Sequence, residues 1–442
     1  MKLRWGNTSV VQFLTHHWQR QPLLLRGFVE PDAVDAELQS LQDHARSALV
    51  PSRLIRQRNA AWSLAHGPFD RLPSLRTPGW TILLQGMDCV HPQAYALRCA
   101  FPFLPQARID DVMISVASRG GGVGAHADAY DVFLVQGRGR RRWRWGWQSD
   151  HALQANRPLK LLQRFDPQQE AVLEPGDALY LPPSWCHEGE ALEPCSTWSV
   201  GFRAPSRKEF LSHFLCEAAD PVCGNDPRYA DPHPYSRRPQ EAVQPHPYPF
   251  ERRGGPRAGR AAQTNAATSP VMTLPSITPV HSARIPQRLE DQLERWALGY
   301  RPNRATLRRA LGRFLTEAPS HAVFELPPEG LALADFATLV CDRGIHLAPA
   351  TRMLYSASHA WINGESAGSA LGWIRRLADQ RGLAAHDLRS QRCRRASNAA
   401  DLEPIENECK QSVDFPPLFH RLYGWYSWGW IRCGELPSSS NL

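Results

Sequence analysis

Short apolar runs, separated by glycine and proline, fill the first half of the chain. Between residues 13 and 203 these runs are rich in β-branched and aromatic residues, and they include WTILLQGM, DDVMISVAS, YDVFLVQG, DALYLPP and STWSVGFR. Runs of about four to eight residues at short spacing are typical of antiparallel strands. This half is therefore expected to form a β-sandwich or barrel, with one surface helix over residues 32–50.

Helical spacing of apolar residues dominates the chain after the strand-rich half. Ser206 precedes an apolar run and Glu209 follows three residues later, a capping box that predicts a helix over residues 206–219. Residues 220–285 are rich in proline and arginine and predict an extended linker, because they have little apolar surface to bury. Apolar positions at helical spacing return over residues 286–318, which predicts packed helices.

The last part of the chain, residues 319–442, mixes both patterns. It predicts a helix, a strand pair joined by an Asn363-Gly364 turn, and a second helix, an order that suits a small winged-helix module. A final helix that packs into the core is expected at the tryptophan-rich end, which contains Trp425, Trp428 and Trp430.

Charge, cysteine content and the lengths of the apolar runs indicate where in the cell this protein acts. The formal net charge of +8 favours anionic neighbours such as nucleic acid or ribonucleoprotein. The ten cysteines form no CxxC pair, so neither a zinc site nor a disulfide framework is expected. No run approaches the roughly 20 apolar residues that span a membrane, and the amino terminus lacks a secretory apolar segment. We expect an intracellular protein in the cytoplasm.

Three polar residues in the strand-rich half match a metal site. In a strand, residues two apart project from the same face, so His126 and Asp128 present an imidazole and a carboxylate to one point. His187 closes the loop after the strand in DALYLPPSWCHEG. Two histidines and one carboxylate form the facial triad that leaves positions open on Fe(II). Taken singly, each histidine is more often structural, and the glycine-rich lead-in RGGGVGAH is expected to be flexible.

The arginine run RGRRRWRWGW has two faces. Alternation places Arg141 on the same face as two tryptophans, and places Arg140, Arg142 and Arg144 on the other face. An arginine on an aromatic inward face needs an anion, and its planar guanidinium matches a carboxylate. The outward arginines fit a solvated strand with a basic outer face.

An iron triad with an arginine for a dicarboxylate indicates an Fe(II)- and 2-oxoglutarate-dependent dioxygenase. The stretches GGGVGAHADAYDVFLVQGRGRRRWRWG, YLPPSWCHEG and WSVGFRAPSRKEFL resemble the bacterial ribosomal oxygenases, JmjC-type cupin enzymes that hydroxylate an arginine of a large-subunit ribosomal protein. The resemblance implies an α+β fold, with a JmjC/cupin double-stranded β-helix barrel over residues 1–205. It also implies a helical dimerisation region over residues 286–318, a C-terminal winged-helix domain over residues 319–442, and a homodimer.

The same resemblance assigns roles to individual residues. His126, Asp128 and His187 would bind iron, and Arg141 would hold the distal carboxylate of 2-oxoglutarate. O2 would be the second co-substrate. The remaining candidates are Ser115 at the co-substrate, Asp110 for the substrate arginine with Asp111 as second choice, and Tyr130 in the substrate groove.

Two alternatives stay open on the sequence. A histidyl hydroxylase or lysine demethylase of the same class would keep the site and change the substrate. A non-catalytic cupin that binds RNA or the ribosome would use the basic surface alone, so direct nucleic-acid binding is left undecided.

Overall fold

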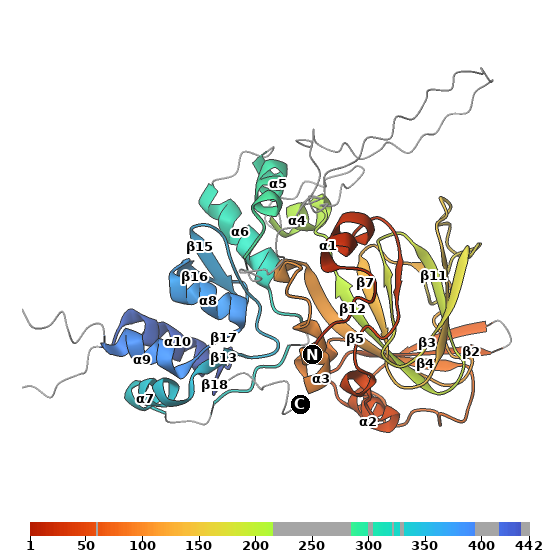
Figure 1. Ribbon diagram of the computed structural model, residues 1–442, viewed down its shortest axis with the longest axis horizontal. Helices are drawn as coiled ribbons and strands as arrows, with labels where there is room; N and C mark the ends of the chain where they lie inside the picture. Colours follow the sequence, from red (N-terminus) through yellow and green to blue (C-terminus); the bar gives the residue numbers. More distant parts are fainter. Residues whose placement is uncertain are drawn as a thin grey trace, which may run out of the picture.

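A computed structural model describes residues 1–58, 61–214, 284–298, 304–320, 322–327, 331–393 and 415–434. Figure 1 shows a β-rich body built from the first half of the chain, with a smaller helical and β module from the second half beside it. Residues 220–283 of the predicted linker lie outside the described residues. Ile285, at the end of that predicted linker, is buried and belongs to the packed module.

The body contains two antiparallel sheets. An eight-stranded sheet has the order β1-β10-β7-β12-β5-β4-β2-β3, and a four-stranded sheet has the order β6-β11-β8-β9. The larger sheet consists of β1 (Leu23–Leu25), β2 (Ser52–Arg58), β3 (Ala61–His66), β4 (Trp80–Leu84), β5 (Ile109–Ala117), β7 (Asp131–Gln136), β10 (Ala178–Leu181) and β12 (Cys195–Phe202). The smaller consists of β6 (His126–Ala127), β8 (Arg141–Gly146), β9 (Gln169–Leu173) and β11 (Cys186–Ala191).

Strand β7 shows why its segment is apolar throughout. Val132 and Leu134 pack between the two sheets with Trp143 of β8. Phe133 and Val135 point to the opposite face, into the main core. Because successive side chains alternate between two buried faces, the sequence has a continuous apolar run. The sheets thus enclose an interior, as the predicted barrel requires.

Short helices cover the outer face of the large sheet (Figure 1). They are α1 (Val10–Gln12), η1 (Phe13–His17), η2 (Pro31–Val34), α2 (Leu38–Asp43), η3 (His44–Arg46), η4 (Met87–Cys89), α3 (Pro92–Arg98) and η5 (Gln106–Arg108). The single helix predicted over residues 32–50 is wrong. Val34, Ala36 and Leu38 are all buried, so every second side chain points to the core. This alternation is that of extended chain, and the chain between η2 and α2 is therefore not helical.

Three helices begin the second half: α4 (Arg207–Phe214), α5 (Gln287–Leu298) and α6 (Arg304–Thr316). The predicted capping box is confirmed, because the Ser206 amide donates to the Glu209 carboxylate at 2.8 Å and the Glu209 amide donates to the Ser206 hydroxyl at 3.1 Å. The apolar faces of these helices share one core with Leu354 and Trp361 of the following strands. The helices are thus anchored within their own chain.

The remaining module alternates helices and short strands. It contains α7 (Leu333–Arg343), β13 (Ile345–Leu347), β14 (Met353–Tyr355), β15 (His359–Ile362), β16 (Glu365–Ser369), α8 (Gly372–Gln380), β17 (Gly382–Leu383), α9 (Ala385–Cys393), α10 (Pro417–Ser427) and β18 (Ile431–Cys433). The strands form two sheets, β14-β15-β16 and β17-β13-β18. The predicted Asn363-Gly364 turn joins β15 to β16, with positive φ at both residues.

The tryptophan-rich end is only partly the predicted helix. Trp425 is buried on α10, but the helix ends at Ser427 and Trp428 is 54% exposed. Gly429, with φ of 71°, reverses the chain into β18. Among the described helices, none combines the length and the apolar character that a membrane crossing needs.

Candidate active site

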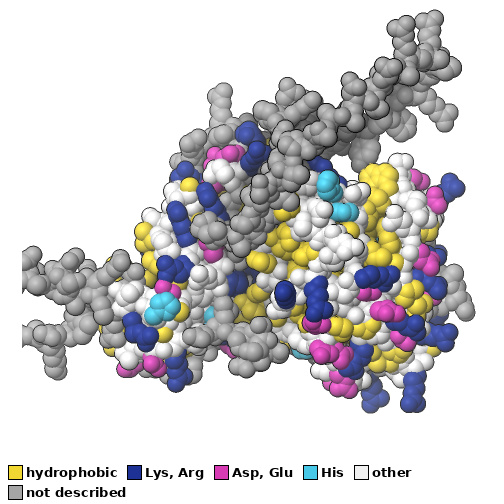
Figure 2. Space-filling model, viewed as in Figure 1, with side chains coloured by type: hydrophobic (Ala, Val, Ile, Leu, Met, Phe, Trp, Pro, Cys, Tyr) yellow, Lys and Arg dark blue, Asp and Glu magenta, His cyan; other side chains and the backbone are white. Residues whose placement is uncertain are grey.

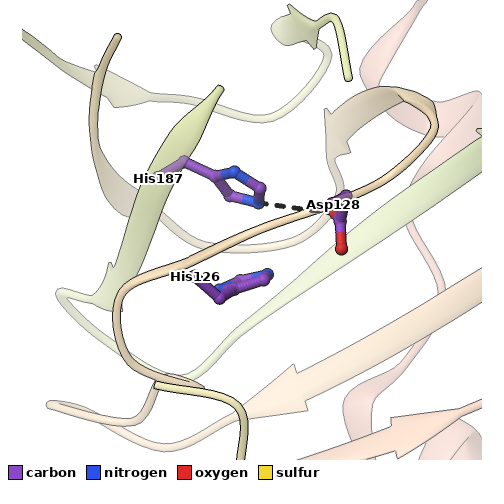
Figure 3. Close-up of side chains that lie close together, drawn as sticks. All are labelled: His126, Asp128 and His187. Atoms are coloured by element: carbon purple, nitrogen blue, oxygen red, sulfur yellow. Dashed lines mark ion pairs between the residues drawn. The ribbon is translucent and has the colours of Figure 1, made fainter. Parts of the chain in front are cut away.

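Three side chains that could bind a metal meet inside the barrel. His126 on β6 pairs directly with His187 on β11, and Asp128 follows two residues after His126. The potential ligand atoms of the three residues all lie within 4.8 Å of one another. His187 Nε2 is 3.7 Å from Asp128 Oδ2, and Figure 3 shows all three side chains turned toward a common point. His126 and Asp128 thus converge with His187 as predicted, although β6 ends at Ala127 and Asp128 lies directly after it.

Backbone carbonyls fix both imidazole rings. His126 Nδ1 lies 2.9 Å from the Gly124 carbonyl oxygen, and His187 Nδ1 lies 3.0 Å from that of Trp185. A carbonyl only accepts, so each Nδ1 carries the proton and each Nε2 keeps its lone pair. Partners of this kind orient a metal-binding histidine and set its tautomer.

Burial keeps His187 in the form that binds metals. The ring is almost fully enclosed, and burial, followed by the neighbouring His126, lowers the pKa of His187 to about 4. The imidazole is therefore neutral at pH 7, as a metal ligand must be.

The glycine tract before His126 is held close to β4 and β11, in contrast to the predicted flexible lead-in. The Gly120 amide donates to the Ala191 carbonyl at 2.7 Å, and the Ala191 amide donates to that of Gly121 at 2.9 Å. A Cβ on Gly121 would lie 2.2 Å from the Trp80 carbonyl oxygen, and one on Gly122 would lie 2.4 Å from that of Gly189. The glycines permit close backbone packing, and this packing places His126 opposite His187.

Arg141 faces the same interior. Its side chain is buried, lies over the Trp143 ring at 5.7 Å, and donates from Nη1 to the Ser115 hydroxyl at 3.3 Å. Nε and Nη2 are buried without a hydrogen-bond partner, and no carboxylate forms an ion pair with this guanidinium among the described residues. A buried guanidinium with two free donors is costly unless an anion binds it. The side chain thus fits an anionic ligand, and a carboxylate suits its planar donors.

The other arginines of this run, Arg140 directly before β8 and Arg142 and Arg144 on it, face outward and are matched by glutamates. Arg144 pairs with Glu188 at 2.7 Å, and Arg140 pairs with Glu193 at 3.0 Å. Arg142 lies between glutamates on β9 and β11, at 3.5 and 3.6 Å. On the face drawn in Figure 2, acidic side chains likewise lie among the basic side chains of the body. The outer face of β8 is a ladder of ion pairs, so the expected basic surface is largely neutralised there.

A cavity of about 330 Å³ connects these groups. Its walls contain every candidate predicted from the sequence: His126, Asp128, His187, Arg141, Ser115, Asp110, Asp111 and Tyr130. Apolar side chains from both sheets line the rest, among them Met113, Leu134 and Trp143. A largely apolar pocket with a few convergent polar groups is typical of a small-molecule or side-chain binding site.

Two neighbouring carboxylates at the start of β5 differ in their partners. The Asp110 carboxylate has two arginines at ion-pair distance, Arg203 at 4.0 Å and Arg352 at 3.9 Å. Asp111 accepts one hydrogen bond, from the Gly86 amide at 3.0 Å, and has no ion pair among the described residues. Burial, followed by the negative charges of Asp88 and Asp110, raises the pKa of Asp111 to about 7. Asp111 is therefore the carboxylate that still lacks a cation.

Several cavity residues were not found from the sequence. Arg53 of β2 and Lys160 bring basic groups to the wall, and Thr197 and Ser199 of β12 bring hydroxyls. The two β12 hydroxyls alternate along STWSVGF at the strand period, a signal that was available. Lys160 follows a turn, and no local pattern predicts that it reaches the cavity.

Comparison with known proteins gives one matching family, and it covers the part of the chain that contains the site. Residues 96–210, which span β5 to α4 and hold the triad and Arg141, match the family described as "JmjC domain".

The relatives are ribosomal oxygenases. The chain is 40% identical over 242 residues to "Ribosomal protein uL16 3-hydroxylase" of Escherichia coli, covering 52% of this chain and 63% of the relative. It is 34% identical over 221 residues to "Probable ribosomal oxygenase" of Haemophilus influenzae, covering 49% and 54%. The alignments thus span less than two thirds of either relative.

Solved structures extend the likeness along the chain. The structure of YcfD from Escherichia coli superposes with a TM-score of 0.68 at 26% identity, covering 98% of this chain and all of that one. YcfD described as a ribosomal oxygenase in complex with cobalt and 2-oxoglutarate gives 0.66 at 25%, covering 98% and 99%. The predicted resemblance to the bacterial ribosomal oxygenases is confirmed.

Proposed function

We propose that this chain is an Fe(II)- and 2-oxoglutarate-dependent dioxygenase that hydroxylates an arginine side chain of a large-subunit ribosomal protein. One observation carries the proposal: a single cavity brings together a two-histidine, one-carboxylate cluster and a buried arginine that lacks an anion. The relative named uL16 3-hydroxylase, and the YcfD complex with cobalt and 2-oxoglutarate, support the same chemistry.

Different residues of the cavity bind the metal, bind the co-substrate and exclude water. His126, Asp128 and His187 hold the metal through two imidazole Nε2 atoms and a carboxylate oxygen. Arg141 and the Ser115 hydroxyl bind the distal carboxylate of 2-oxoglutarate and orient it. Bound iron with 2-oxoglutarate supplies the activation of O2 that oxidises a C–H bond, with succinate and CO2 as co-products. The apolar wall, which includes Trp143 and Leu134, excludes water from the reacting groups.

The acidic end of the cavity selects the substrate side chain. Asp111 offers a carboxylate without a cation, so a guanidinium entering the cavity gains a charge-assisted hydrogen bond there. This favours Asp111 over Asp110, which the sequence ranked first and which already has two arginines at ion-pair distance. Tyr130, 36% exposed on the cavity wall, offers its ring to the stem of the substrate side chain.

The experiment is product analysis on intact ribosomal proteins. Protein loaded with iron, 2-oxoglutarate and air is expected to add 16 Da to one arginine of a large-subunit protein, located by mass spectrometry. His126→Ala and Asp128→Ala are expected to abolish both this product and the accompanying succinate. Near wild-type succinate from either variant would contradict the triad.

The same measurement separates the alternatives. Addition of 16 Da to a histidine would replace the arginine assignment with a histidyl hydroxylase, and loss of 14 Da from a lysine would indicate a demethylase. Salt-dependent RNA binding without metal uptake would support a non-catalytic ribosome-binding protein. The cation-free Asp111 beside the metal cluster favours a cationic side chain as substrate.

The remaining parts of the prediction are retained as proposals. We infer a catalytic barrel over residues 1–205 followed by α4, then a helical region over residues 286–318 and a winged-helix-like module over residues 319–442, while residues 215–283 lie outside the described residues. A ribosomal substrate supports a cytoplasmic location. We propose a homodimer; if it forms through α5 and α6, it uses their outer surfaces, because their apolar faces are already buried within the chain.

A further inference from the structure

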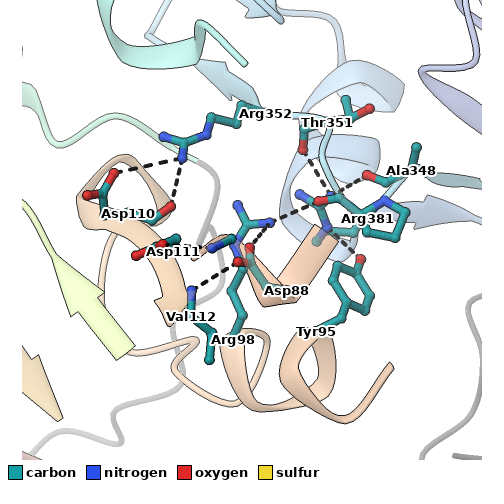
Figure 4. A network of polar contacts seen from close by, with 12 residues as sticks. Asp88, Tyr95, Arg98, Asp110, Asp111, Val112, Ala348, Thr351, Arg352 and Arg381 are labelled. Carbon is teal, nitrogen blue, oxygen red and sulfur yellow. Dashed lines mark hydrogen bonds and ion pairs between the residues drawn. The ribbon is translucent and has the colours of Figure 1, made fainter. Parts of the chain in front are cut away.

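Polar contacts join the C-terminal module to the barrel beside α3 and β5 (Figure 4). Each uses an arginine that is largely buried. The three contacts are Arg98 Nη1 to the Pro349 carbonyl at 3.0 Å, Arg381 Nε to the Tyr95 hydroxyl at 2.8 Å, and Arg352 Nη2 to the Asp110 carbonyl at 2.7 Å. Of the three, only the contact of Arg352 ends on a residue that lines the cavity.

The segment that carries Arg352, residues 348–352, is fixed within its own module. Arg381 Nη2 donates to the carbonyls of Ala348 and Thr351, at 2.9 and 3.0 Å. The Arg352 amide donates to Asn363 Oδ1 at 2.9 Å, and the Asn363 amide donates to the Arg352 carbonyl at 2.9 Å. The Arg352 side chain therefore starts from a rigid base, so it loses little freedom when it binds Asp110.

The start of β5 is held from the other side by the barrel itself. The Gly86 amide donates to Asp111 Oδ2 at 3.0 Å, and the Val112 amide donates to Asp88 Oδ1 at 2.9 Å. The Arg352 contact is made to the residue directly before Asp111. Residues 110–112 thus lie between two sets of hydrogen bonds, one from the barrel and one from the C-terminal module.

We propose that Arg352 is a positioning residue for the substrate, through which the C-terminal module completes the acidic wall of the cavity. Its hydrogen bond to the Asp110 carbonyl fixes the direction of the Asp111 side chain. Its charge, with that of Arg203, occupies the Asp110 carboxylate, so that Asp111 is the carboxylate left to bind a substrate cation. This inference rests on the proposed function, because it assigns Arg352 to the recognition of the same cationic side chain.

Arg352 keeps its charge in a buried position. Its side chain is 11% exposed, and burial, followed by Arg203 and Arg98, lowers the pKa of Arg352 to about 10, so it remains a cation at pH 7. Burying a cation costs free energy that a neutral contact between two modules would avoid. Arg98 and Arg381 are buried to the same degree, so burial alone would fit docking, and Arg352 is set apart from them because its partner Asp110 lines the cavity.

The test compares steady-state kinetics of Arg352→Met with those of wild-type protein, using a uL16 peptide that contains the arginine located by the product analysis. Loss of one charge-assisted hydrogen bond is expected to raise the peptide KM about fivefold to tenfold. The kcat, the KM for 2-oxoglutarate and the succinate formed without peptide are expected to stay within about twofold, since neither Arg141 nor the triad is touched. Arg352→Lys retains the charge and is expected to recover part of the affinity.

Two matched variants separate positioning from docking. Tyr95→Phe removes the hydrogen bond from Arg381 to the barrel and keeps the ring under the guanidinium, and Arg421→Ala removes a contact to the Ala367 carbonyl inside the module. Both are expected to leave the peptide KM unchanged. An unchanged KM in Arg352→Met, or an equal rise in Tyr95→Phe, would overturn the assignment. So would a loss of peptide-independent succinate in a variant that still folds by circular dichroism.

A binding measurement keeps this test independent of turnover. Fluorescence anisotropy with the labelled uL16 peptide, on protein loaded with Mn(II) and 2-oxoglutarate under nitrogen, is expected to give a Kd about fivefold weaker for Arg352→Met. A wild-type protein that binds this peptide without hydroxylating it would contradict the proposed function and still test Arg352. A wild-type protein that neither binds nor hydroxylates the peptide would overturn both the proposed function and the role of Arg352, since the cavity would then lack the cationic substrate site that both require.

Discussion

The two faces of strand β8 differ in whether their arginines have acidic partners. Arg141 points into the barrel, where its guanidinium has two donors without a partner, whereas Arg140, Arg142 and Arg144 point outward and each lies beside a glutamate. The start of β5 repeats the contrast with carboxylates, because Asp110 is flanked by arginines and Asp111 is not. The comparison suggests that the unpaired charges, those of Arg141 and Asp111, bind ligands, whereas the paired charges beside them stabilise the fold.

The largest effect is expected from a matched pair on β8. Arg141→Met removes the free donors and should raise the KM for 2-oxoglutarate about 100-fold, because charge-assisted hydrogen bonds contribute about 1.5–3 kcal/mol each. Arg142→Met makes the same chemical change on the outer face and should leave that KM within about twofold. Equal effects of the two substitutions in a succinate assay would break the comparison.

A smaller effect is expected from the carboxylate pair. Asp111→Asn should raise the KM for an arginine peptide about tenfold, since the neutral amide loses the attraction to a guanidinium. Asp110→Asn should change it by less than about threefold, because its charge is already neutralised by arginines. Peptide titrations of the two variants, loaded with the same metal, measure the difference. The opposite order would restore Asp110 as the substrate residue.

The pH dependence of peptide binding sharpens the same contrast. The pKa of Asp111 in the free protein is raised to about 7, so a substantial share of this carboxyl is protonated at pH 6 and most of it is ionised at pH 8. A cation binds the ionised form, so peptide affinity should increase severalfold from pH 6 to pH 8. In Asp111→Asn the peptide affinity should depend less on pH. Peptide titrations of both proteins between pH 6 and pH 8 measure this difference. A slope that persists unchanged in the variant would assign the titration to another group.

The smallest effect belongs to the outer ladder. Glu188→Gln breaks the exposed pair with Arg144 and should lower the free energy of unfolding by about 0.2–1 kcal/mol, since solvent screens such pairs. Activity should not change. Urea denaturation alongside the succinate assay checks both statements, and a loss of turnover would show that the outer face takes part in the chemistry.

The sequence predicted the local features well, because strand periodicity alone decides them. The alternation of two put His126 and Asp128 on one face, and it separated Arg141 from its neighbours; the structure has both arrangements. It also identified Asp110 and Asp111 as a pair at the start of a strand. Local pattern could not rank the two, because the difference lies in Arg203 and Arg352, distant in sequence.

Other misses have the same origin in long-range packing. The helix expected over residues 32–50 is broken because its apolar residues fit an extended connection against the main core. The role of Arg352 depends on the meeting of two modules, which no window of the sequence contains. Composition suggested a basic surface, but the glutamates that neutralise β8 lie on β9, on β11 and in the turn after β11.

The glycine tract at residues 120–122 has a consequence for how this protein tolerates change. It carries no side chain that reacts or binds, yet an added Cβ at Gly121 would collide with the Trp80 carbonyl of β4, and one at Gly122 would collide with the Gly189 carbonyl of β11. A survey of single substitutions across the chain would rank these positions with His126 and His187 in their intolerance. Sensitivity to mutation therefore does not require a chemical role here. These glycines take no part in binding or reaction, yet their close packing sets the distance between His126 and His187.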